Sequence, residues 1–147
     1  MSVERYTLSS LLSRLIDIED KAGNFYVHSG IDDDEFTNYF PILSKEHQET
    51  ATKIEVAKRG TIVEFALEPI SGVDIEKCLK GIDDTILSKQ ITALDKSIRI
   101  EEKISQLYAN AAEKIAHMSG EASQLLLSSN KKAKKRLDIL RQLQKEQ

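Results

Sequence analysis

Residues 19–26 read Glu19-Asp20-Lys21-Ala22-Gly23-Asn24-Phe25-Tyr26, and this segment carries the strongest fold signal in the chain. Glu19 precedes Tyr26 by seven residues, and Glu101 precedes Tyr108 by the same interval in a second segment. Seven residues are close to two turns of an α-helix, so each Glu lies on the same face as its Tyr. Both glutamates interrupt stripes that are otherwise apolar, and a carboxylate in such a place needs a partner inside the protein.

Apolar residues spaced by three and four continue on both sides of each segment and predict four helices. We expect the helices at residues 7–29, 35–59, 84–116 and 120–144. Gly60 follows the second helix as a stop signal, and Ser119 is placed to cap the last one. The intervening residues 60–84 lose the helical period and contain Pro69, so we interpret them as a long crossover that includes a short helix at residues 73–79.

The composition agrees with amphipathic helices, because 40% of the 147 residues are hydrophobic and 31% are charged. We therefore predict one all-α domain over residues 1–147, built as two helix pairs. Cys78 is the single cysteine, which excludes an internal disulfide and a four-cysteine metal centre.

Charge and hydropathy argue against nucleic-acid and membrane partners. The net charge is −3, and the basic run from Lys131 to Arg136 spreads around a helix as a solvated face. No segment approaches the roughly 20 apolar residues that cross a bilayer, and residues 1–10 do not resemble a signal peptide. We expect a soluble, cytoplasmic protein.

Polar residues interrupt every stripe near its middle, where the helices of a bundle meet at one level. These residues are Glu19, His47, Thr50, Glu101 and Arg136. The sequence therefore predicts a buried polar site to which all four helices contribute, flanked by Tyr26 and Tyr108.

This pattern resembles the rubrerythrin branch of the ferritin-like superfamily. In that family the first and third helices each supply a Glu within Glu-x-x-Ala-x-x-x-Tyr, and the second and fourth each supply Glu-x-x-His. Glu19-x-x-Ala22-x-x-x-Tyr26 matches the first helix, and Glu101 with Tyr108 matches the third, although Ile104 replaces the small residue. The resemblance implies a ferritin-like four-helix bundle with a long crossover between its second and third helices, and a di-iron site held by six side chains.

The other half of the chain departs from the family pattern. His47 and Thr50 stand where the second helix supplies Glu and His, and Ala133 and Arg136 stand at the corresponding positions of the fourth helix. A shift of three residues would instead make His47 the ligand and Ser44 the lost Glu. Arg136 adds a positive charge that deprotonation cannot remove. We therefore predict that Arg136 replaces the metal and donates to both Glu19 and Glu101, with His47 and Thr50 completing the network.

Two functional hypotheses follow from the resemblance. The first is a non-catalytic protein without a cofactor that has lost the di-iron centre and acts structurally, as a homodimer or as a binding module for an unidentified protein partner. The alternative is a metal-binding oxidoreductase, a peroxide reductase or iron oxidase, with iron or manganese held by Glu19, His47 and Glu101.

Overall fold

Helices dominate the computed structural model, which describes residues 5–29, 38–60 and 67–146. Within these residues the chain forms five helices and one pair of two-residue strands. The helices are α1 (Leu8–Ser29), α2 (Phe40–Arg59), α3 (Ile75–Leu87), α4 (Ala93–Ile115) and α5 (Gly120–Lys145). The strands β1 (Arg5–Tyr6) and β2 (Ile70–Ser71) pair in the antiparallel sense, with Tyr6 opposite Ile70. The all-α prediction is confirmed.

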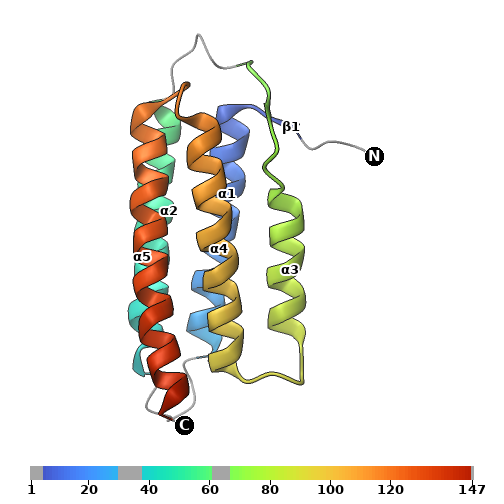
Figure 1. Cartoon of the computed structure of the whole chain (residues 1–147), viewed down its shortest axis with the longest axis vertical. Helices are drawn as coiled ribbons and strands as arrows, with labels where there is room; N and C mark the ends of the chain where they lie inside the picture. Colours follow the sequence, from blue (N-terminus) through green and yellow to red (C-terminus); the bar gives the residue numbers. More distant parts are fainter. Residues whose placement is uncertain (1–4, 30–37, 61–66, 147) are drawn as a thin grey trace.

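The four long helices form a bundle of two antiparallel pairs (Figure 1). The most extensive contacts are those between α1 and α2 and those between α4 and α5. Helices α2 and α4 run in the same direction, because α2 finishes at the upper end of the bundle in Figure 1 and α4 starts at the lower end. Between them the chain passes through β2 and α3, and α3 packs against α4 and α1. This arrangement brings the middles of all four long helices to one level.

Local capping explains where three of the helices begin. The Asp74 carboxylate accepts a hydrogen bond from the backbone N–H of Lys77 at the start of α3, at 2.9 Å. The side chains of Thr92 and Ser119 accept equivalent bonds at the starts of α4 and α5, both at 3.1 Å. Each cap satisfies a backbone donor that the helix leaves open. The cap predicted at Ser119 is confirmed.

The predicted helix at 84–116 is wrong at its start, since residues 84–87 belong to α3 and α4 begins only at Ala93. Ser88 and Thr92 both have extended backbones, with ψ angles of 133° and 162°. Their side chains favour local bonds over helix continuation. Leu87, at the end of α3, is 76% exposed and does not belong to the buried face of the bundle. The short helix predicted at 73–79 overlaps the first turns of α3, which begins two residues later at Ile75. The predicted start of the second helix at residues 35–37 lies outside the described residues, and α2 itself begins at Phe40.

The predicted stripe of α1 lies in the core, since each of its six members is buried. They are Leu8, Leu12, Leu15, Glu19, Ala22 and Tyr26. Apolar residues of α2, α4 and α5, among them Ile54, Ile104 and Leu126, complete a single hydrophobic cluster. No helix in the described ranges combines the length and the apolar character that a membrane span requires.

Candidate functional site: a buried ionic network

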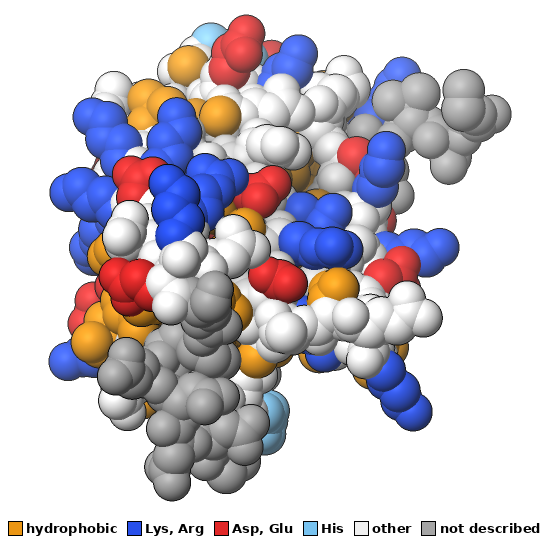
Figure 2. Space-filling view, turned by 60° about the horizontal axis from the view of Figure 1, so that its bottom comes forward, with side chains coloured by type: hydrophobic (Ala, Val, Ile, Leu, Met, Phe, Trp, Pro, Cys, Tyr) orange, Lys and Arg blue, Asp and Glu red, His pale blue; other side chains and the backbone are white. Residues whose placement is uncertain are grey.

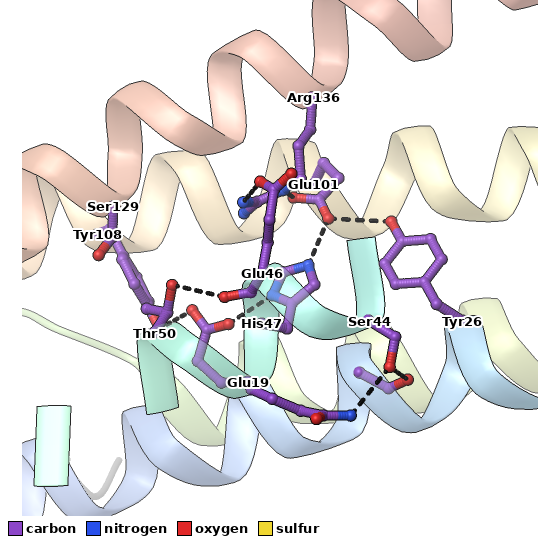
Figure 3. A network of polar contacts seen from close by, with 12 residues as sticks. Glu19, Tyr26, Ser44, Glu46, His47, Thr50, Glu101, Tyr108, Ser129 and Arg136 are labelled. Carbon is purple, nitrogen blue, oxygen red and sulfur yellow. Dashed lines mark hydrogen bonds and ion pairs between the residues drawn. The ribbon is translucent and has the colours of Figure 1, made fainter. Parts of the chain in front are cut away.

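The four long helices each place one charged residue at the centre of the bundle (Figure 3). Glu19 comes from α1, His47 from α2, Glu101 from α4 and Arg136 from α5. Their exposed fractions are only 0–2%. The structure therefore brings together the residues that the sequence predicted to converge, with the exception of Thr50.

His47 lies between the two carboxylates and contacts both of them. Its Nδ1 atom binds Glu19 Oε2, and its Nε2 atom lies 2.7 Å from Glu101 Oε1. Burial by itself would lower the pKa of His47, but the charges of Glu101 and Glu19 outweigh burial and raise this pKa to about 9. At neutral pH His47 is an imidazolium that donates from both ring nitrogens.

Glu101 accepts from three residues. Arg136 Nε donates to Oε2 at 2.8 Å, while the Tyr26 hydroxyl donates to Oε1 at 2.9 Å alongside His47. Burial opposes the charged form of Glu101, but His47 and Arg136 together lower its pKa to about 2. Tyr26 also stacks on the His47 ring, with centroids 5.6 Å apart and planes 12° from parallel. Glu101 is therefore a fixed carboxylate at the hub of the network.

Glu19 is satisfied by a different pair of donors. The Tyr108 hydroxyl donates to Glu19 Oε1 at 2.6 Å, and His47 occupies Oε2. Burial, followed by the charge of the neighbouring glutamate, holds the pKa of both Tyr108 and Tyr26 well above the usual tyrosine value. The two tyrosines thus remain protonated donors, and the two Glu–Tyr repeats pair crosswise, each Tyr with the Glu of the other helix.

Two details of the predicted network are wrong. Arg136 does not donate to Glu19; its second bond is from Nη1 to Glu46 Oε1, at 3.2 Å. Thr50 does not join the charged residues, because its hydroxyl donates to the backbone carbonyl of Glu46 at 3.0 Å. A hydroxyl in a helix can bond the carbonyl one turn earlier, and this local bond is available without any tertiary contact.

Glu46 was not among the residues that the sequence predicted for this site. Its side chain is 33% exposed and reaches from α2 to the guanidinium on α5. The number of donors on Arg136 could have indicated a further acceptor such as Glu46, since a guanidinium has five N–H groups and one carboxylate cannot satisfy them all. Glu46 is the member of the network that connects it to the surface.

The donor set does not fit a di-iron centre. All four carboxylate oxygens of Glu19 and Glu101 accept hydrogen bonds within the protein, and both ring nitrogens of His47, the positions that could bind a metal, donate to these carboxylates. Two buried carboxylates are balanced by two cations, His47 and Arg136, and the guanidinium keeps its charge at any ordinary pH. Among the described residues, no group of three or more His, Cys, Asp or Glu side chains is arranged to hold a metal ion.

Cys78 lies half-buried on α3. Burial raises the pKa of its thiol to about 11, so the thiolate that redox chemistry requires is scarce at neutral pH.

Comparisons of the chain with protein-family models, with curated proteins and with solved structures gave no match.

Proposed function

We propose that this protein is a ferritin-like, rubrerythrin-related bundle that has lost its di-iron centre and has a metal-free ionic network in its place. The observation that carries this proposal is the closed set of hydrogen bonds in which Glu19 and Glu101 share the His47 imidazolium, and Arg136 binds Glu101. Each cation takes the place of positive charge that metal ions would otherwise supply to the two carboxylates.

The arrangement of the helices supports the proposed ancestry. Two antiparallel pairs, with α2 parallel to α4 and a long connection between them, form the arrangement that the resemblance implies (Figure 1). The two Glu–Tyr repeats lie on α1 and α4, the first helix of each pair, as the family pattern requires.

The geometry favours a non-catalytic role. A substrate would have to reach groups that are at most 2% exposed and whose polar atoms are already paired. Charges held in this way hold the helices in register, which is the best-attested use of buried polar groups. We therefore infer a structural or partner-binding protein rather than an oxidoreductase.

Metal analysis tests the proposal. The protein is purified after growth with added iron and manganese, and its metal content is measured by mass spectrometry. We expect far less than one metal per chain, with no difference between the natural chain and Glu101→Gln. Stoichiometric metal that disappears in Glu19→Gln and in Glu101→Gln would establish the oxidoreductase alternative instead.

A gain-of-metal variant tests the ancestry separately. His47→Glu, Thr50→His, Ala133→Glu and Arg136→His together restore the residue types of the family pattern. We expect this variant to bind iron while the natural chain does not. A folded quadruple variant that still binds none would contradict the derivation from a di-iron protein.

A further inference from the structure

Helix α3 lies outside the arrangement of the four long helices and covers the seam between α1 and α4 (Figure 1). Helices α1 and α4 contact each other little, and α3 packs against both of them. Two hydrogen bonds of the buried network cross this same seam, since Glu19 and Tyr26 lie on α1 while their partners Tyr108 and Glu101 lie on α4. The seam that α3 covers is therefore the one that the network spans.

Two ion pairs, which we call the α3 ion pairs, join α3 to α1. Arg14 Nε donates to the Glu76 carboxylate at 2.7 Å, and the Lys21 ammonium lies 2.7 Å from the Asp83 carboxylate. The four side chains are 34–47% exposed, so water and salt screen both pairs. Basic and acidic side chains lie next to one another on the side of the molecule where α3 lies (Figure 2).

The middle of α3 lies over the Tyr108–Glu19 end of the network. The two α3 ion pairs have the same offset in sequence, so α1 and α3 run parallel and Glu19 lies level with Gly81. On the α4 side, the end of the Lys103 side chain lies against Gly81. The pKa of Tyr108 is raised by burial first and by Glu19 second, and Cys78 of α3 adds to the rise, which places Tyr108 within electrostatic reach of α3.

The packing of α3 on the bundle is shallow. Its buried apolar side chains, Ile75, Leu79 and Ile82, form one stripe spaced by four and three residues. A groove of about 580 Å³ lies between α3 and α1, and a smaller groove of about 250 Å³ lies between α3 and α4. Gly81 weakens the helix at its middle, because glycine is a poor helix former. Few buried apolar contacts and half-exposed ion pairs are typical of a part that opens locally.

The attachment of α3 is firmer on its α4 side than on its α1 side. Its contacts with α4 are the more extensive. Two α4 side chains also bond the backbone near its ends: Asn110 donates to the carbonyl of Gly72, and Lys96 donates to the carbonyl of Ile86, both at 2.7 Å. On the α1 side the larger groove lies beside the α3 ion pairs. The side of α3 that can separate most easily is therefore the side that faces α1.

We propose that α3 is a lid, hinged on α4, which opens from the α1 side while the four long helices stay folded, and that its opening admits water to the Tyr108–Glu19 end of the buried network. Tyr108 and Glu19 are 0% and 1% exposed, so access to them requires such a movement. The α3 ion pairs hold the lid closed. This device goes beyond the proposed structural role, and it does not depend on whether the network has replaced a metal centre.

Nitration by tetranitromethane at about pH 8 tests the lid, because this reagent modifies tyrosines whose phenolate reaches solvent. Modified tyrosines are identified by mass spectrometry of peptides, and every chain compared carries Cys78→Ser because thiols also react. Tyr26 is the internal reference. It is as deeply buried as Tyr108 and also donates to a glutamate, but it packs against Phe40 and His47 of α2.

Glu76→Gln combined with Asp83→Asn removes both α3 ion pairs and leaves the buried network unchanged. We expect Tyr108 in this variant to be nitrated about three- to tenfold faster, since two half-exposed ion pairs shift an opening equilibrium by about that factor. The nitration rate of Tyr26 should stay the same. Circular dichroism checks that the variant is folded, which these half-exposed positions favour.

Glu55→Gln combined with Glu102→Gln is the matched control, because it removes two half-exposed ion pairs on other helices, those with Arg59 and Arg141. It should leave the nitration rates of both tyrosines unchanged. Hydrogen exchange followed by mass spectrometry gives a second readout. A short helix that leaves the bundle frays, so the amides of residues 75–87 should exchange faster in the variant without the α3 ion pairs, while those of α1 and α4 stay protected.

Three results would overturn the proposal. Equal acceleration of Tyr108 and Tyr26, or exchange of α3 only together with α1 and α4, would mean that the network is reached by opening the whole bundle. Faster exchange of α3 without faster nitration of Tyr108 would mean that α3 moves but does not cover the network. Unchanged exchange and nitration without the α3 ion pairs would mean that these pairs do not hold α3 closed.

Discussion

Replacing Arg136 with leucine should destabilise the protein severely, because the substitution leaves the buried Glu101 carboxylate without one of its two cations. Leucine keeps the aliphatic stem of the side chain and removes the guanidinium. Glu101 would retain His47 and Tyr26 as donors, but the buried charges would change from two against two to two carboxylates against one cation.

The magnitude follows from the two bonds that Arg136 makes. The 2.8 Å bond to fully buried Glu101 is charge-assisted and contributes about 1.5–3 kcal/mol. The 3.2 Å bond to Glu46, which is 33% exposed, contributes about 1 kcal/mol at most. Together with the cost of an uncompensated buried charge, these values place the loss at about 3–5 kcal/mol.

Urea unfolding followed by far-ultraviolet circular dichroism measures this loss. Arg141→Leu is the matched control, since Arg141 lies on the same helix and pairs with Glu102 at 3.4 Å, but its side chain is 49% exposed. We expect the control to lose less than about 1 kcal/mol. If Arg136→Leu is too unstable to measure, Arg136→Lys keeps the charge and should fall between the two.

A double-mutant cycle shows whether the loss comes from the ion pair. Adding Glu101→Gln to Arg136→Leu removes the carboxylate that Arg136→Leu leaves without a partner. The free energy of unfolding lost in the double variant should therefore be smaller than the two single losses added together, by about 2 kcal/mol or more. An Arg136→Leu loss below about 1 kcal/mol, or two changes that add without coupling, would show that the buried ion pair contributes little to stability.

Two further outcomes follow from the same network, and a third from the α1–α2 crossing beside it. The charged His47 stabilises the fold fully below pH 6.5, its pKa in the unfolded chain, and this contribution is lost as the pH rises to its folded pKa of about 9. The charged Glu101 stabilises the fold fully above pH 4.5, its pKa in the unfolded chain, and this contribution is lost as the pH falls to its folded pKa of about 2. Urea midpoints should therefore fall on both sides of pH 4.5–6.5, and a midpoint that stays level from pH 6.5 to 9 would contradict the charged imidazole. Tyr108→Phe and Tyr26→Phe should each cost about 1.5–3 kcal/mol in urea unfolding, because each leaves a buried carboxylate one donor short; losses below about 0.5 kcal/mol would show that these hydroxyls do not matter. Gly23→Ala should stabilise α1 by about 0.5–1 kcal/mol, since a new Cβ would lie 3.7 Å from its nearest neighbours, at ordinary contact distance; a lower thermal midpoint would show that the α1–α2 crossing is tighter than that.

The sequence predicted most of the bundle because periodicity and capping are local signals. The stripe around Glu19 and the cap at Ser119 needed only neighbouring residues to be read. The break between α3 and α4 was missed because Leu87 and Leu94 are seven residues apart and fit one helical face equally well in a continuous helix. Ser88 and Thr92 carry the local signal for the break, and the packing of α3 beside α4 is the tertiary contact that goes with it.

The candidate site was predictable in its members more than in its bonds. Glu19, His47, Glu101 and Arg136 converge because their helices meet at mid-height, which spacing along the sequence indicates. Which donor meets which acceptor depends on side-chain reach across the bundle. Arg136 is long enough to pass Glu101 and reach Glu46 near the surface, while the imidazole ring fills the shorter gap to Glu19.

On the proposed ancestry, the ionic network and a di-iron centre meet the same electrostatic requirement by different means. Carboxylates in a core need positive charge nearby, and metal ions supply it only while the protein is loaded. His47 and Arg136 supply it from the chain itself, so the folded state no longer depends on metal availability. Replacing metal ions with these two side chains makes stability depend on pH instead. The charge of His47 is lost near pH 9, whereas the charge of Arg136 is not. Arg136 is therefore the residue whose appearance would make the loss of metal irreversible: with a permanent cation bonded to Glu101, restoring the other ligands alone would not restore a metal site.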